Sequence, residues 1–252
     1  SSSPPGSDER ISCIICAYNE APRIAAVLEV LAVHPMLHEI IVVDDGSTDE
    51  TAEVVKRFHS VRLISHQINR GKSFAMATGV AAAQGELLML IDADLVGLAA
   101  EHVTALAAPV LSGQAAVSFS LRRNSLPIFR AIGLDFVSGE RVVKRELLSE
   151  VLEEIRELPR FGIEVFMNRR IIAQQLAIAV TNWTHVTQSR KTEKLGFWKG
   201  VRAEWRMITD LLDVAYPRVL LSQTWQLLAL RTNRPSASEY VLRFIRPGYN
   251  LR

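Results

Sequence analysis

Residues 87–94, Leu-Leu-Met-Leu-Ile-Asp-Ala-Asp, decide how this chain is expected to fold. Five apolar residues in succession predict a strand that is buried on both faces of a parallel sheet. Because residues two apart in a strand point the same way, Asp92 and Asp94 should project together from its carboxyl end. Open α/β sheets bind ligands at that end, and two close carboxylates favour a divalent cation between them. Taken alone, the pair can equally be solvated turn residues that cap the next helix.

The residues before this strand alternate between predicted strands and predicted helices. Apolar runs predict strands at 11–17, 40–45 and 61–64. Helices are expected at 21–33, from a capping box at Ser47-x-x-Glu50 through Phe58, and at 73–83. This β-α-β-α-β-α-β order predicts an α/β fold, with a mostly parallel, doubly wound central sheet and helices on both faces. Polar residues that follow separate strands should then gather at one edge of the sheet.

The second half of the chain gives weaker signals. Strands are expected at 115–121 and 177–180. Helices are expected at 101–111, 141–158, 162–176, 197–216 and about 225–230.

Composition narrows the classes of protein. Hydrophobic residues make up 48% of the chain and charged residues 22%, as in ordinary globular proteins. The net charge of +2 gives no broad basic field for nucleic acid. No apolar run is long enough to span a membrane and no signal peptide is recognisable, which favours the cytoplasm. Cys13 and Cys16 should face opposite sides of one strand, so we interpret them as core thiols in a reducing compartment.

Three common catalytic or nucleotide-binding motifs are not found. Gly71-Lys72-Ser73 matches the end of a P-loop, but a glycine is needed at position 66, which is His66. The first predicted strand is not followed by G-x-G-x-x-G, and G-x-S-x-G does not occur. The remaining candidate site is a sheet edge with several carboxylates and a lysine at a helix start.

Four short segments, in order, resemble the family 2 glycosyltransferases of GT-A fold. The segments are Ala17-Tyr18-Asn19-Glu20, Asp44-Asp45-Gly46-Ser47-Thr48-Asp49, Asn69-Arg70-Gly71-Lys72 and Asp92-Ala93-Asp94. The resemblance implies a single GT-A domain over residues 10–216, with a nucleotide-binding half at 10–96 and an acceptor half at 97–216. Residues 217–252 are then a helical extension or tail, and residues 1–9 a disordered lead or tag remnant.

The same resemblance implies roles at a nucleotide-sugar site. Nucleoside hydroxyls and an imide N–H need acceptors, and a diphosphate leaving group needs positive charge. Oxygen ligands favour Mg²⁺ or Mn²⁺, which the D-x-D motif would bind. The alternative for Asp94 is a capping residue. On this resemblance the nucleoside pocket would be lined by Ala17, Tyr18, Asn19 and Glu20, and Asp45 would form a hydrogen bond to the base. Lys72 would lie near the nucleotide, and Asp92 and Ala93 beside the ribose or the metal. Asp94 would ligate the metal.

The acceptor side is expected from two further segments, Ser138-Gly139-Glu140-Arg141 and Gly162-Ile163-Glu164. They resemble acceptor regions of polyprenyl-phosphate sugar transferases and of glucosyl-3-phosphoglycerate synthases. Glu164 would orient the acceptor or act as general base, and a helix-start glutamate favoured by the helix dipole is the equal alternative. His185 would complete the metal site, unless it is a structural histidine after a strand.

Basic and aromatic residues supply the remaining expectations. Arg190, Lys191 and Lys194 would close over the diphosphate as a lid, or form a solvated loop. Arg122 and Arg123 are candidates for an acceptor phosphate. The helix at 197–216 carries Trp198 and Trp205 and would pack in the core or lie on a membrane surface.

The expected function is metal-dependent transfer of a hexose from a UDP- or GDP-sugar to an acceptor. A polyprenyl phosphate at the inner membrane face is the first choice of acceptor, and a small phosphorylated acid is the second. A nucleotidyltransferase is disfavoured because residues 17–20 lack a glycine-rich basic motif. A sugar-nucleotide-binding protein without activity is disfavoured by the intact Lys72, Asp92 and Asp94. The amphipathic helices would serve a homodimer as well as a core.

Overall fold

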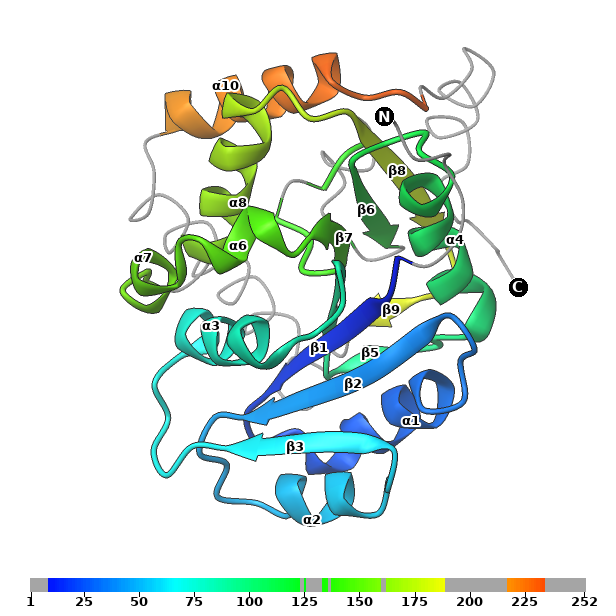
Figure 1. The fold of residues 1–252 in the computed structure, drawn as a ribbon, viewed down its shortest axis with the longest axis vertical. Coiled ribbons are helices and arrows are strands. Elements are labelled where there is room, and N and C mark those ends of the chain that lie inside the picture. Colours follow the sequence, from blue (N-terminus) through cyan, green and yellow to red (C-terminus); the bar gives the residue numbers. More distant parts are fainter. Residues whose placement is uncertain are drawn as a thin grey trace, which may run out of the picture.

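A seven-stranded sheet organises the described part of the chain, which in this computed structural model is residues 9–122, 125, 133–135, 137–159, 162–188 and 217–233. The strand order is β3-β2-β1-β4-β7-β6-β8, and β5 and β9 form a separate two-stranded ribbon (Figure 1). The strands are β1 Ile11–Ala17, β2 Leu37–Asp44, β3 Val61–Ser65, β4 Leu87–Asp92, β5 Leu95–Val96, β6 Val117–Arg122, β7 Arg141–Lys144, β8 Ile178–Trp183 and β9 Thr187–Gln188. The helices are α1 Ala21–Leu31, α2 Thr51–Lys56, α3 Lys72–Ala82, α4 Ala100–Leu111, α6 Glu146–Ser149, α7 Leu152–Arg156, α8 Gly162–Ala173 and α10 Pro217–Ala229.

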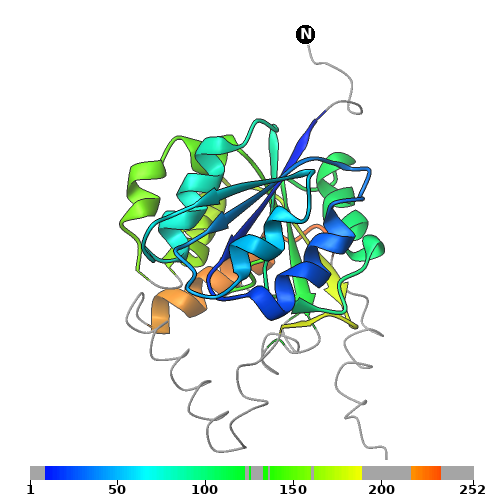
Figure 2. The same cartoon turned by 90° about the horizontal axis from the view of Figure 1, so that it is seen from below.

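The first four strands run parallel, as the alternation of strands and helices predicts. β1 lies between β2 and β4, with Ile14 opposite Ile41 on one side and Leu90 on the other. Two apolar cores follow from the alternation along each strand. Ile14 packs into the core beneath α3 and α6–α8, and Ile15 into the core beneath α1, α2 and α4. Figure 2 shows α3 and α1 on opposite sides of the sheet. The doubly wound α/β prediction is confirmed.

The predicted helix at 141–158 is wrong, because its first residues form β7. This strand is antiparallel to both β4 and β6 and lies between them in the sheet. Val142 and Val143 are fully buried, as β-branched residues in a central strand should be. Arg141 is also buried, since its guanidinium donates to Ser138 O (2.8 Å) and Asn168 Oδ1 (2.7 Å). The short helices α6 and α7 take up the rest of the range.

The predicted capping box at Ser47-x-x-Glu50 is also wrong. The α2 helix begins at Thr51, and its N-cap residue, Glu50, makes no side-chain capping bond. The Ser47 hydroxyl instead accepts the N–H of Asn19 at 2.9 Å, which ties the loop after β2 to the loop after β1. The serine therefore joins two loops of the sheet edge.

The terminal helix α10 packs against α8 and is followed by a return to the sheet. Arg231 forms a parallel bridge with Ile178 of β8. The Asn233 side chain makes two hydrogen bonds with the backbone of Val180, at 2.8 and 2.7 Å. Among the described residues no helix is both long and apolar enough to cross a membrane. The predicted helix at 197–216 and the residues Arg123, Arg190, Lys191 and Lys194 lie outside the described residues.

Candidate active site

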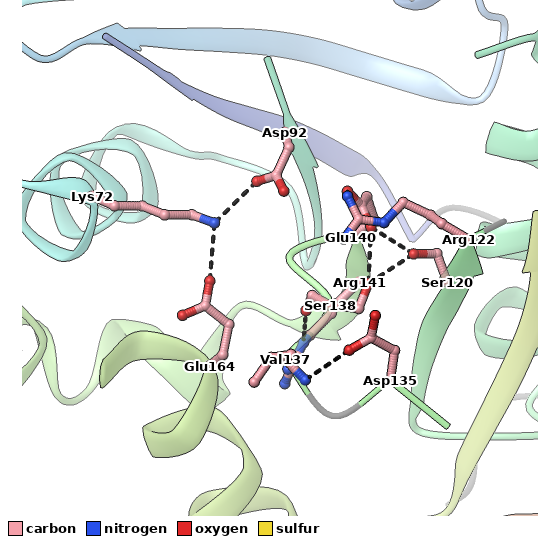
Figure 3. A network of polar contacts seen from close by, with 10 residues as sticks. All are labelled: Lys72, Asp92, Ser120, Arg122, Asp135, Val137, Ser138, Glu140, Arg141 and Glu164. Carbon is pink, nitrogen blue, oxygen red and sulfur yellow. Dashed lines mark hydrogen bonds and ion pairs between the residues drawn. The ribbon is translucent and has the colours of Figure 1, made fainter. Parts of the chain in front are cut away.

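Three segments that are distant in sequence meet at Lys72, the first residue of α3. Its ammonium Nζ donates to Asp92 Oδ1 at 3.0 Å and to Glu164 Oε1 at 2.9 Å (Figure 3). Asp92 ends β4, and Glu164 lies in the first turn of α8. The residues predicted at the nucleotide and at the acceptor are therefore within one ion-paired cluster, at the carboxyl end of β4.

The charges of this cluster support one another. Burial by itself lowers the pKa of Lys72, but Asp92 and Glu164 raise it well above its ordinary value. Burial raises the pKa of Asp92, but Lys72 and Arg122 hold it below its usual range. Lysine and aspartate are therefore both charged at neutral pH.

Glu164 is the most buried member of this cluster, with its side chain only 2% exposed. Lys72 occupies Oε1, whereas Oε2 is buried without a hydrogen-bond partner among the described residues. Buried polar atoms are normally paired, so this oxygen has a capacity to accept a hydrogen bond that no described residue supplies. A hydroxyl is the simplest donor for such a bond.

Asp45 holds the loop that presents Lys72. It is 3% exposed, and its carboxylate accepts the backbone N–H groups of Arg70 and Gly71, at 2.7 Å for the latter. The ring nitrogen Nδ1 of His66 lies 2.8 Å from the same carboxylate. These contacts order the 69–72 segment before α3. The role of Asp45 toward a nucleobase stays a prediction.

The residues expected to contact the nucleoside lie where the loops after β1 and β2 meet. The backbone of Asn19 has φ +55°, and its Oδ1 accepts the N–H groups of Thr48 and Asp49. Tyr18 is 44% exposed and so is available to a ligand, whereas Glu20 pairs with Arg23 at 2.6 Å. The N–H of Asp45 donates to Ala17 O at 2.8 Å. The structure thus brings the first two motif segments together.

The metal prediction rests on Asp94 and His185, which flank the β5–β9 ribbon. Leu95 pairs with Gln188 and Val96 with Thr187, so Asp94 lies beyond one end of the ribbon and His185 beyond the other. Among the described residues, no group of three or more histidine, cysteine or carboxylate side chains is arranged so that it could hold a metal ion by itself. Magnesium is commonly held by one or two carboxylates together with substrate phosphates, and the aspartates of the D-x-D segment fit that donor set. Shared ligation by His185 stays a prediction.

A second polar network lies behind Asp92 and was not predicted from the sequence. Glu140 is fully buried, and its Oε1 pairs with Nη1 of Arg122 at 3.1 Å. The hydroxyls of Ser120 and Ser138 donate to its Oε2 at 2.6 and 2.8 Å. The arginine expected to bind an acceptor phosphate is thus engaged with a carboxylate inside the protein.

The model of the family described as "Glycosyl transferase family 2" matches residues 12–162. The chain belongs to this family. Poly-beta-1,6-N-acetyl-D-glucosamine synthase of Staphylococcus epidermidis is 37% identical over 92 residues, which cover 35% of this chain and 22% of that protein. A dolichyl-phosphate beta-glucosyltransferase of Trichomonas vaginalis is 35% identical over 94 residues, covering 32% and 28%. The chain therefore matches less than a third of the length of these curated relatives.

Solved structures match over more of the chain. Glucosyl-3-phosphoglycerate synthase from Mycobacterium tuberculosis, in complex with Mn²⁺, UDP and glucosyl-3-phosphoglycerate, has a TM-score of 0.63 and 25% sequence identity. The match covers 82% of this chain and 80% of that chain. The same enzyme has been solved with Mn²⁺, UDP-glucose and phosphoglyceric acid, with a TM-score of 0.62. The predicted GT-A fold and family are confirmed.

Proposed function

We propose that this chain is a metal-dependent glycosyltransferase that moves a hexose from a UDP-sugar to the hydroxyl group of a phosphorylated acceptor. The observation that carries the proposal is the Lys72–Asp92–Glu164 cluster, with the unpartnered Oε2 of Glu164 beside it. Family membership and the Mn²⁺- and UDP-bound neighbours support this class of reaction.

The donor would bind at the carboxyl ends of β1, β2 and β4. Tyr18 and Asn19 would contact the nucleoside, and Asp94 with Asp92 would hold Mg²⁺ or Mn²⁺. A bound divalent ion neutralises the charge that develops on a diphosphate leaving group. Lys72, whose side chain is 37% exposed, would add positive charge on the same side. UDP is favoured over GDP by the uridine nucleotides in the neighbouring structures.

The acceptor would lie against Glu164. Its Oε2 would accept the hydrogen bond of an acceptor hydroxyl, while Lys72 fixes Oε1 and so orients the carboxylate. In the reaction the acceptor oxygen forms a bond to the anomeric carbon. The bond between that carbon and the diphosphate breaks, UDP leaves with the electron pair, and the hydroxyl proton passes to Oε2.

A lipid phosphate is the second candidate acceptor, because some curated relatives are dolichyl-phosphate glucosyltransferases. The sequence alone favours a lipid phosphate as the acceptor, whereas the surroundings of Glu164 favour a hydroxyl group. A phosphate monoester carries close to two negative charges at neutral pH, so it needs no base and would be repelled by a buried carboxylate. A hydroxyl acceptor supplies the proton that the unpartnered oxygen lacks.

Transfer from radiolabelled UDP-glucose with Mn²⁺ tests the proposal directly. The acceptors tested would be 3-phosphoglycerate and a polyprenyl phosphate. The variants compared with the wild type would be Glu164→Gln and Glu150→Gln. Glu150 is a matched control, because its side chain is 71% exposed and only loosely paired with Arg170. We expect the wild type to transfer glucose to 3-phosphoglycerate. Glu164→Gln should lower kcat by roughly 10²- to 10⁴-fold, and Glu150→Gln should not.

Two results would contradict the proposal. Absence of transfer from any UDP- or GDP-hexose to either acceptor would refute glycosyltransfer by this chain. Transfer to polyprenyl phosphate at a rate that Glu164→Gln leaves unchanged would replace the hydroxyl acceptor by the lipid phosphate.

A further inference from the structure

We propose that Glu140 is a positioning residue for Asp92, and that together with Gly139 it fixes the Asp92 carboxylate in the orientation that meets Lys72. The inference rests on the proposed function only in taking Asp92 as part of the donor site. Nothing in the comparisons assigns a role to the turn between residues 138 and 140.

Gly139 forms one wall around Asp92. A Cβ atom at this position would lie 2.7 Å from both carboxylate oxygens of Asp92 and 3.0 Å from its carboxyl carbon. Real Cβ atoms do not approach other atoms so closely, so only glycine leaves room for the carboxylate here. The backbone of the 138–140 turn is therefore in close contact with the carboxyl group that pairs with Lys72.

Glu140 directly follows Gly139 in this turn and anchors it from several sides. It accepts hydrogen bonds from Ser120, Ser138 and Arg122 (Figure 3). Because the glutamate is fully buried and bonded both to β6 and within its own turn, the turn that contacts Asp92 has little freedom to move. A rigid neighbour of this kind holds a binding group in its working geometry before the ligand arrives.

A purely structural role would be to balance the charge of Arg122 inside the sheet. The two roles predict different results, because positioning acts on donor binding and charge balance acts on stability. Asp135 offers the matched control. It is a carboxylate of the same network, 2% exposed, and accepts the N–H of Val137 at 3.2 Å.

The experiment compares Glu140→Ala, Gly139→Ala and Asp135→Asn with the wild-type chain. Calorimetry with UDP and Mn²⁺ gives nucleotide affinity, steady-state kinetics with UDP-glucose and 3-phosphoglycerate separate the two substrates, and thermal unfolding reports stability. We expect Glu140→Ala and Gly139→Ala each to weaken donor affinity roughly ten- to a hundredfold, the cost of losing one buried polar contact. The KM for the acceptor should stay within about twofold in both, and Asp135→Asn should leave donor affinity within about twofold.

Gly139→Ala keeps the test decisive if Glu140→Ala does not fold, because it displaces Asp92 and keeps Glu140. Equal donor affinity in Gly139→Ala and wild type would refute positioning, as would an equal loss in Asp135→Asn. If the wild-type chain binds no UDP- or GDP-sugar, the proposed function fails by itself. Crystal structures of the wild type and Gly139→Ala then decide the inference, which requires the Asp92 carboxylate to leave Lys72 in the variant and is wrong if it stays.

Discussion

Replacing Lys72 with methionine should destabilise the fold in a pH-dependent way. The substitution keeps the unbranched stem of the side chain without its terminal nitrogen, and so leaves Asp92 and Glu164 without the cation that both contact, at 3.0 and 2.9 Å. Removing one partner of a buried ion pair commonly costs about 3–5 kcal/mol. Because the lysine side chain is 37% exposed, water screens part of this loss, and we expect about 2 kcal/mol at neutral pH.

The pH dependence follows from the folded-state pKa of Asp92. Burial raises this pKa, but the positive charges of Lys72 and Arg122 lower it below its usual value. A carboxylate with a lowered pKa stabilises the fold above its unfolded pKa, about 3.9, and this contribution is lost as pH falls through the folded value. The difference between the wild type and Lys72→Met should therefore be full at pH 7 and shrink as the carboxylates become protonated below about pH 4.

Urea unfolding followed by tryptophan fluorescence, at several pH values, measures this difference. Lys56→Met is the matched control, because Lys56 pairs with Glu53 on the surface and should change the free energy of unfolding by less than about 0.5 kcal/mol. In Lys72→Met the further change Glu164→Gln should restore part of the loss, since it removes one uncompensated charge. The reasoning is refuted if Lys72→Met costs no more than Lys56→Met, or if its cost is the same at about pH 3 as at pH 7.

Two further predictions concern the backbone and the thiols. Gly46 and Gly113 have φ +71° and +72°, but a Cβ at Gly46 would lie 2.5 Å from Ile68 C, whereas Gly113 has open space. Gly113→Ala should cost about 1 kcal/mol in unfolding free energy and Gly46→Ala at least about 2, and equal costs would mean that the contact is unimportant. Burial raises the pKa of Cys13 strongly and that of Cys16 to about 12. Neither thiol should react with a disulfide reagent at pH 8 until urea is added, and rapid reaction of the native protein would contradict this.

The parallel half of the fold was readable from the sequence because its signals are local. β1 and β4 are apolar along almost their whole length, and each is buried on both faces, so pattern and position agree. The site residues of this half follow from the same pattern. Lys72 and Asp92 stand at the start of a helix and the end of a strand, and the parallel sheet brings such positions to one edge.

The second half was harder because long-range contacts decide it. The strand β7 begins at Arg141 and ends at Lys144, and in the sequence these residues are typical of a charged helix. Arg141 is accommodated in the core because its guanidinium contacts Asn168, the Ser138 carbonyl and the Phe119 ring. The network around Glu140 was missed for the same reason. The sequence singled out the 138–141 segment but gave no sign that its glutamate anchors the turn that contacts Asp92.

The most direct test of the proposed function is calorimetry of UDP binding, with and without Mn²⁺, to wild type, Asp94→Ala and Glu29→Ala. Glu29 is an exposed carboxylate in the last turn of α1 and serves as the control. We expect Mn²⁺ to tighten UDP binding to the wild type and to Glu29→Ala, and Asp94→Ala to lose that enhancement. If UDP binds the wild type no more tightly than Asp94→Ala in the presence of Mn²⁺, a metal-assisted nucleotide-sugar site at this sheet edge is contradicted.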